Sequence, residues 1–255
     1  MEIFDGLNNE QIKAVKTING PVLILAGAGS GKTKTLTHRV AYLLSQGVNP
    51  ENILAITFTN KAAEEMRNRI GKLLAISHKL FIGTFHSFGA KILRQEIECL
   101  GYKNNFVIYD EDDSFSLAKD IINDLNLSRD RFKAGSLLNL TSKFKSELEN
   151  PEEASIDADD FYKRQFIRFY NLYNKRLKAA NAVDFDDLII LPVQIFSNKS
   201  ILEKYQNQYR YILVDEYQDT NHAQYSLINL MAQRNKNLFA IGDPDQAIYG
   251  WRHAD

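Results

Sequence analysis

The sequence predicts an α/β fold, in which a parallel sheet carries helices on both faces and a mainly α-helical subdomain is inserted into it. Three observations predict this class. Short apolar runs alternate with stretches of helical periodicity, which is the pattern of a doubly wound parallel sheet. A glycine-rich loop follows the first run and an acidic pair follows another, so polar groups gather where strands end. A polar, mainly helical stretch between the third and fourth runs is too long for one crossover.

Five apolar runs are expected to be strands, at 21–27, 52–59, 80–85, 209–215 and 237–242. Helical patterns lie between them at roughly 32–45, 60–75, 86–100 and 221–233. Residues 1–105 and 184–255 are therefore predicted to form one discontinuous domain, and 106–183 the inserted helical subdomain.

The insert contains an unusual segment, residues 161–180, with six basic and six aromatic residues and no acid. The apolar residues of this segment fall on one stripe of a helix, which predicts that this stripe faces the core and that the basic residues face solvent. Contact with a nucleic-acid duplex through the basic face is the alternative. The acid-rich segment 147–160 is expected to be a solvated loop rather than a metal site. The stripe consists of Tyr162, Phe166, Phe169, Tyr173 and Leu177.

Composition limits the function classes. The chain has 255 residues and a formal charge of −1, so it cannot bind a polyanion through bulk charge and any such contact must be local. Its single cysteine, Cys99, excludes an internal disulfide and suits a cytoplasmic location. Neither a signal peptide nor an apolar run of membrane-spanning length is present, so no membrane partner is expected.

The glycine-rich loop AGAGSGKT, residues 26–33, has the spacing of a phosphate-binding loop between a strand and a helix. Glycines let the backbone turn tightly and bring N–H groups near phosphate oxygens. Lys32 can reach the β- and γ-phosphates, and the Thr33 hydroxyl can bind magnesium. The residues expected to contact nucleotide are Ala26, Gly27, Ala28, Gly29, Ser30, Gly31, Lys32, Thr33 and Lys34.

The acidic pair Asp215 and Glu216 falls at the carboxyl end of the fourth predicted strand. Two adjacent carboxylates can divide their roles, so that Asp215 holds Mg²⁺ with Thr33 while Glu216 activates a water. The pair and the loop together predict ATP hydrolysis with ATP and Mg²⁺ as cofactors.

Motifs in a characteristic order extend along nearly the whole chain. They are LNNEQIKAV (7–15), the loop itself, ILAITFTNKAAEEMRNRI (53–70), TFHS (84–87), VDFDDLI (183–189), LVDEYQDT (213–220) and GDPDQAIYGWRHAD (242–255). With them the chain resembles the N-terminal motor domain of superfamily-one DNA helicases of the UvrD/Rep/PcrA type. The resemblance implies a RecA-like P-loop sheet.

The resemblance also implies roles around the nucleotide. Gln11 is expected to read the adenine edge and Arg39 to stack on the adenine, whereas from the residues alone both are ordinary helix residues. Gln246 is expected to sense the γ-phosphate, whereas GDPDQ alone indicates a tight turn. The implied catalytic set is Lys32, Asp215, Glu216 and Gln246.

On the DNA side, the resemblance implies aromatic platforms that stack on bases without reading them. Alone, Phe58 would be read as a core residue and His86 as a capping or core histidine without metal partners. The implied set is Phe58, Tyr249 and Trp251 for bases, with Asn60, Lys61, Thr84, His86 and Arg252 for the backbone.

The function implied is an ATP-dependent 3′–5′ DNA helicase or single-stranded DNA translocase of repair or replication, acting on single strands and single/double-strand junctions. Two alternatives are the motor of a recombination-repair helicase–nuclease and a nonenzymatic nucleotide-dependent DNA-binding module. The chain is expected to be the N-terminal half of such a protein, without the second motor domain and therefore weakly active alone.

Overall fold

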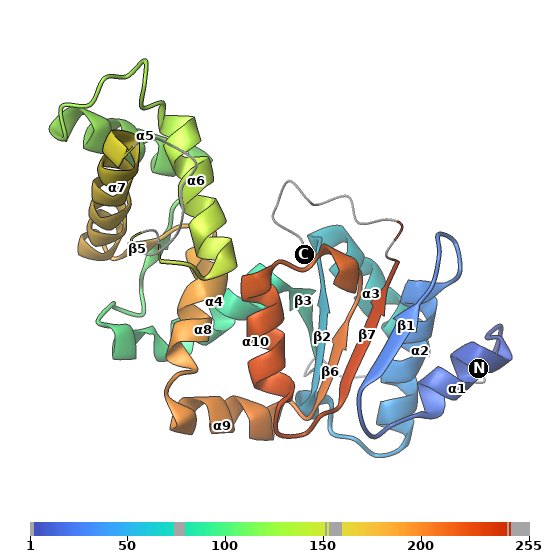
Figure 1. Ribbon diagram of the computed structural model, residues 1–255. Coiled ribbons are helices and arrows are strands. Elements are labelled where there is room, and N and C mark those ends of the chain that lie inside the picture. The colour runs from blue at the N-terminus through green and yellow to red at the C-terminus, as the bar shows by residue number, and fades with distance from the viewer. Residues whose placement is uncertain (1–2, 74–79, 151, 153–159, 244, 246–255) are drawn as a thin grey trace.

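The protein is described by a computed structural model over residues 3–73, 80–150, 152, 160–243 and 245. Its centre is a five-stranded sheet in the order β1-β7-β6-β2-β3, in which every neighbouring pair is parallel (Figure 1). The strands are β1 (Val22–Leu25), β2 (Ile53–Thr57), β3 (Phe81–Thr84), β6 (Tyr211–Val214) and β7 (Leu238–Gly242). The predicted class is confirmed, and each strand lies inside its predicted run.

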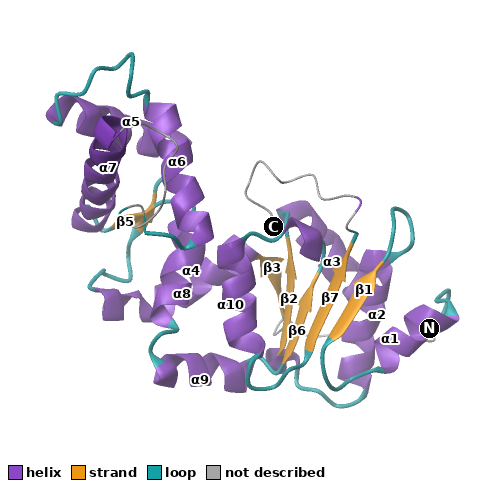
Figure 2. Ribbon diagram, viewed as in Figure 1, coloured by secondary structure: helices purple, strands orange, loops and turns teal. Residues whose placement is uncertain are grey.

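Helices cover both faces of the sheet, and the side chains of β2 explain why. Ile53 and Ala55 point into the core beneath one face, while Leu54 and Ile56 point into the core beneath the other. All four are fully buried, as expected of a central parallel strand. One face carries α2 (Lys32–Ser45) and α3 (Asn60–Leu73); the other carries α4 (Phe85–Glu96), α8 (Asp187–Ile195) and α10 (His222–Ala232) (Figure 2).

Helices α4 and α8 approach one another closely at Gly89. A Cβ atom at that position would lie 1.7 Å from the Leu188 carbonyl oxygen, so only glycine fits between the two backbones. The remaining elements of the sheet part are α1 (Asn9–Lys16), α9 (Lys199–Gln208) and short 3₁₀ helices at Pro50–Asn52, Ile97–Leu100 and Tyr217–Asp219.

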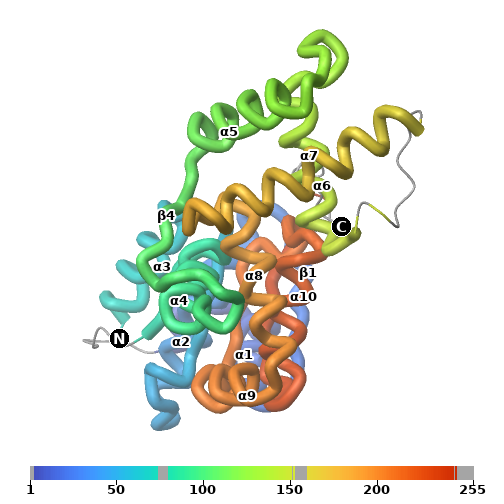
Figure 3. Tube along the Cα trace, turned by 90° about the vertical axis from the view of Figure 1, so that its left-hand side faces the viewer, coloured from blue at the N-terminus to red at the C-terminus, as the bar shows by residue number. Residues whose placement is uncertain are grey.

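Residues 106–183, hereafter the helical insert, contain α5 (Glu111–Asp124), α6 (Ala134–Glu147) and α7 (Asp160–Ala179), which lie to one side of the sheet (Figures 1 and 3). Their core is separate from the two sheet cores and includes Phe166, Phe169, Tyr173 and Leu177 of the predicted stripe. Tyr162 packs at its edge. The exact boundaries of the two parts stay a prediction.

Two short strands mark the points where the chain enters and leaves the helical insert. β4 (Val107–Ile108) pairs in parallel with β5 (Ala182–Val183). Asp110, after β4, caps the first turn of α5 in a capping box with Asp113. Most of the segment 147–160, predicted as a solvated loop, lies outside the described residues. Among the residues that are described, no helix has the length and apolarity needed to cross a bilayer.

Candidate functional site

The glycine-rich loop lies between β1 and α2, at the carboxyl edge of the sheet. Gly29 and Gly31 have φ values of 70° and 85°, which residues with a Cβ atom rarely adopt. The Ala26 N–H donates to the Gly242 carbonyl at 3.0 Å and continues the pairing of β1 with β7 into the loop. Because α2 begins at Lys32, the positive end of its dipole faces the loop, as a phosphate site requires.

Lys32 and Thr33 reach the ends of two other strands. The Lys32 ammonium donates to the Ala26 carbonyl at 3.1 Å and lies 3.4 Å from a carboxylate oxygen of Asp243, just after β7. The Thr33 hydroxyl donates to Asp215 Oδ2 at 3.1 Å, just after β6. The order β1-β7-β6 therefore brings together residues that are about two hundred positions apart in the chain.

The Thr33–Asp215 pair has the chemistry of a magnesium site. Asp215 is 2% exposed, and burial together with the neighbouring Glu216 raises its pKa to about 6, against the smaller opposing effect of Thr33. A cation beside this carboxylate would remove that penalty. A hydroxyl and a carboxylate are ligands that Mg²⁺ accepts, with phosphate oxygens and waters completing the set. The two residues therefore fit the predicted ion.

Glu216 occupies an uncommon backbone conformation. Its φ of 53° is in the left-handed region, which costs energy for any residue other than glycine. Gln218 holds the Glu216 side chain in place. The Gln218 side-chain N–H donates to Glu216 Oε2 at 2.9 Å, and the Gln218 side-chain oxygen accepts from the Asp243 N–H at 2.9 Å. Gln218 thus connects the carboxylate predicted to activate water with the end of β7. Gln218 is part of the motif LVDEYQDT, but the motif alone indicates no contact for it.

Gln11 lies beside the phosphate loop. Its carbonyl oxygen accepts from the Asn8 N–H at 2.9 Å, in a capping box at the start of α1, and its amide donates to the Ser30 carbonyl at 2.9 Å. Lys34 bonds the Gly6 carbonyl at 2.7 Å on the same side of the loop. The nucleotide contacts expected of both residues stay predictions.

Arg39 differs from its expected role. It is 2% exposed, and its guanidinium donates to the carbonyls of Ala14 and Ile18, among others at the end of α1. Its guanidinium carbon lies 4.3 Å from the centre of the Phe239 ring. The side chain ties α1 to α2 and to the sheet, so in this packing it offers no face to an adenine. From sequence alone, an arginine on a helix cannot be assigned either to stacking on a base or to anchoring a neighbouring helix.

The predicted DNA residues separate into two groups. Phe58 is half-buried against Phe85, and Asn60 and Lys61 are exposed at the start of α3, where the helix dipole favours a phosphate. Thr84 is 7% exposed, and its hydroxyl accepts from the Ser87 N–H as the cap of α4. The capping geometry accounts for a threonine at that position, and its contact with DNA stays a prediction.

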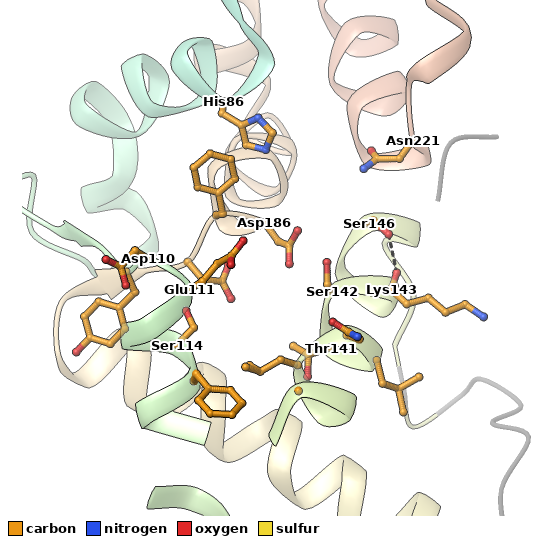
Figure 4. Close-up of a pocket in the computed structure, with 18 of the residues that line it drawn as sticks. His86, Asp110, Glu111, Ser114, Thr141, Ser142, Lys143, Ser146, Asp186 and Asn221 are labelled. Atoms are coloured by element: carbon orange, nitrogen blue, oxygen red, sulfur yellow. Dashed lines mark hydrogen bonds between the residues drawn. The ribbon is translucent and has the colours of Figure 1, made fainter. Parts of the chain in front are cut away.

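His86 lies at the mouth of a cavity of about 1430 Å³ between the sheet part and the helical insert (Figure 4). Its ring stands 4.3 Å from the ring of Phe185, which is 58% exposed and also lines the cavity. Phe58 lines it too. The sequence draws attention to Phe185 only as part of the motif VDFDDLI. The signal that could have identified it as a surface aromatic residue is its position between aspartates within an apolar stretch.

Gln246, Tyr249, Trp251 and Arg252 lie outside the described residues, so their predicted roles stay predictions. Within the ranges that are described, no cluster of three or more histidine, cysteine or acidic side chains could hold a metal.

Comparison with known proteins decides the family. A family model described as the UvrD/REP helicase N-terminal domain matches residues 7–255. The chain belongs to this family. As a UvrD/REP N-terminal domain, it is 47% identical over 255 residues to a protein of Leuconostoc citreum named ATP-dependent DNA helicase PcrA, with 98% of this chain and 34% of the relative covered.

Proteins of the same name from staphylococci are equally similar to this UvrD/REP domain. The one from Staphylococcus aureus strain Mu50 is 46% identical over 99% of the chain, and the one from Staphylococcus epidermidis is 47% identical over 98%. In each case 35% of the relative is covered. The chain therefore spans about a third of the length of these relatives.

Proposed function

We propose that this UvrD/REP domain binds ATP and Mg²⁺ and works within an ATP-dependent DNA helicase or single-stranded DNA translocase. The observation that carries the proposal is the contact between Thr33 and Asp215 beside Lys32, at the ends of neighbouring parallel strands. Relatives that match almost the whole chain and are named ATP-dependent DNA helicase PcrA support it.

In this proposal each residue at the nucleotide has one task. The loop N–H groups and Lys32 hold the phosphates, and Thr33 with Asp215 hold Mg²⁺, which neutralises charge on the transferred phosphate. Glu216 accepts the proton of the attacking water, in an orientation fixed by its contact with Gln218. Gln246 and the residues after it would carry the state of the phosphate to DNA.

A single strand of DNA would lie along the cavity mouth. Phe58, His86 and Phe185 line this cavity, and Asn60 and Lys61, exposed at the start of α3, offer groups for phosphates. Stacking does not read bases, so binding should be largely independent of sequence. Translocation from 3′ to 5′, a preference for single/double-strand junctions, a place in repair or replication, a cytoplasmic location and a second motor domain are the remaining parts of the proposal.

The test is ATP hydrolysis by the full-length protein with and without single-stranded DNA, for the native protein and Glu216→Gln. We expect strong stimulation by DNA in the native protein and its loss in the variant. Equal rates with and without DNA would support the nonenzymatic or DNA-independent alternative. DNA digestion that requires ATP would favour the helicase–nuclease.

A further inference from the structure

A buried ion cluster lies away from the nucleotide, where the helical insert meets the sheet part. The Lys145 ammonium, on α6, donates to Asp184 Oδ2 at 2.6 Å and to Asp187 Oδ1 at 2.7 Å. The three side chains are 3%, 9% and 8% exposed. Charged groups are seldom buried so completely unless each is paired, so the pairing is what allows these three charges to lie in the interior.

Every carboxylate oxygen in the cluster has a partner. The Asp187 N–H donates to the second oxygen of Asp184 at 2.9 Å, and the Asp184 N–H donates to the second oxygen of Asp187 at 3.2 Å. The two aspartates therefore close the Asp184–Asp187 turn reciprocally just before α8, and Lys145 completes the arrangement. Burial alone would lower the pKa of Lys145, but Asp184 and Asp187 outweigh it and raise the pKa well above its usual value, so the lysine stays charged.

Phe185 lies between these two anchored aspartates and points the other way. It is 58% exposed, and its ring stands 4.3 Å from the ring of His86 on α4. Asp184 and Asp187 fix the backbone on both sides of Phe185, so they also determine where its ring can lie. The cluster thereby sets the geometry of the His86–Phe185 ring pair at the cavity mouth.

Lys145 adds a second property, because it comes from the helical insert rather than from the turn itself. The ring of Tyr173, on α7, lies 5.5 Å from the ammonium and helps to shield it from water. A shift of α6 relative to α8 would pull the ammonium from both carboxylates. The position of the insert and the position of Phe185 are therefore mechanically linked through one side chain.

We propose that Lys145 is a positioning residue for single-stranded DNA: it locks the Asp184–Asp187 turn, and through that turn it holds Phe185 against His86 at the cavity mouth. This inference rests on the proposed function, since it assigns a determinant of DNA affinity to a residue that touches no DNA. The proposed role differs from direct binding of DNA, because Lys145 is too deeply buried to contact a phosphate.

The first test measures binding of an oligothymidylate by full-length protein with Lys145→Met, using fluorescence anisotropy. We expect affinity to fall about tenfold, within the range for one lost stacked base, and the KM for ATP to stay within about twofold. Lys133→Met is the matched control, because Lys133 is exposed at the start of the same helix and does not line the cavity. Native DNA affinity in Lys145→Met would overturn the proposal.

Salt dependence separates positioning from phosphate contact. A lysine that binds a phosphate releases a counterion, and its removal lowers the slope of log Kd against log salt by about one unit. For Lys145→Met we expect weaker binding with an unchanged slope. A reduced slope would show that the lysine meets the DNA backbone and would overturn the proposal.

A double-variant cycle tests whether Lys145 acts through Phe185. Phe185→Ala alone should weaken binding about tenfold, and adding Lys145→Met should cause little further loss, because the ring it positions is gone. A loss equal to the product of the two single effects would overturn the proposal.

Lys145→Met leaves two buried carboxylates without their cation and can prevent folding. The triple variant Lys145→Met/Asp184→Asn/Asp187→Asn keeps the capping oxygens without buried charge and should also bind about tenfold more weakly; native affinity would overturn the proposal. If native protein shows no DNA-stimulated ATPase, the proposed function itself fails. If stimulation is normal and the Lys145 variants bind normally, only this inference fails.

Discussion

Glu216 combines a strained backbone with a tightly held side chain. A left-handed φ at a non-glycine residue persists only where its surroundings enforce it, and here Gln218 bonds the carboxylate directly. The arrangement holds one carboxylate in place directly after Asp215, at the edge of the sheet where the phosphate loop lies. This is the geometry expected of a group that orients and deprotonates a single water molecule.

Glu216→Gln should therefore slow DNA-stimulated ATP hydrolysis by about a hundredfold or more, because the amide cannot accept the proton. Binding of ATP should stay close to native. Steady-state hydrolysis and nucleotide titration measure the two effects, with Glu203→Gln on the exposed face of α9 as control. Hydrolysis at the native rate would remove Glu216 from the mechanism.

Lys32→Ala should weaken ATP binding by about tenfold to a hundredfold, as expected for the loss of charge-assisted contacts to phosphate. The variant also leaves Asp243 without its lysine partner, so the midpoint of thermal unfolding should be measured in parallel. Nucleotide affinity equal to native in a folded variant would refute the role of Lys32.

Asp186 provides a prediction about pH. Burial and the nearby Asp184 raise its pKa from 3.8 to about 7. Between these pH values the folded protein holds more protons on Asp186 than the unfolded chain does, so this group makes stability fall as pH rises. One proton accounts for at most about 1.4 kcal/mol per pH unit.

Asp186→Asn should consequently gain stability relative to native protein on going from pH 5 to pH 8. Thermal unfolding at both pH values checks this, with Asp130→Asn in an exposed turn as control. A difference between variant and native that does not change with pH would contradict the assignment.

Among the elements, the contact between α4 and α8 determines the spacing of the His86–Phe185 ring pair. His86 is on α4 and Phe185 lies two residues before α8, and the two helices meet at Gly89 without space for one additional carbon. The spacing of the ring pair therefore depends on the closeness of two backbones.

Gly89→Ala should destabilise the protein by about 1–3 kcal/mol, the usual cost of overpacking, and should weaken binding of single-stranded DNA by separating the rings. Gly71→Ala is the matched control. It is also helical, meets nothing within 4 Å, and should stabilise by about 0.5–1 kcal/mol. Denaturant unfolding and oligothymidylate binding measure both effects; a neutral Gly89→Ala would show that α4 and α8 can separate freely.

Elements with strong local signals were predictable from sequence. Strands at Ile53–Thr57 and Leu238–Gly242 are short, apolar and followed by motifs, and each was placed to within about two residues. Helix α8 was not assigned, because a helix that is buried around most of its surface has no polar face to give a periodic pattern. Helix α4 ends earlier than predicted, at Glu96, where a 3₁₀ turn continues it.

The candidate site was predictable where chemistry is concentrated in a few adjacent residues, as in the loop before Thr33 and the pair at Asp215. It was not predictable where it depends on distant segments. Lys145 reaches Asp184 across 39 positions, and Arg39 reaches the end of α1 rather than a base. Such pairings follow from how helices pack, and a single sequence carries no local sign of them.

At the scale of the whole molecule, the cavity between the sheet part and the helical insert has walls from both. Ser142 of α6 faces it from one side, and His86 and Asn221 lie on the other (Figure 4). A strand bound there would touch segments that are far apart in sequence.

Single-stranded DNA should therefore slow amide hydrogen exchange in full-length protein at three separate segments, residues 85–87, 139–146 and 184–187. Exchange in α9 (Lys199–Gln208), which does not line the cavity, should not change. Mass spectrometry of exchanged peptides checks this; slowing confined to the sheet part would show that the insert takes no part in binding.

The pairing of β4 with β5 has a consequence for the history of the protein. Val107 lies directly beside Ala182, so the chain leaves the sheet part and returns to it at the same place. A segment whose two ends meet can lengthen, shorten or be exchanged during evolution without pulling on its host. The helical insert can thus change in length far from this junction without displacing the five strands, provided that Lys145 keeps its contacts with Asp184 and Asp187.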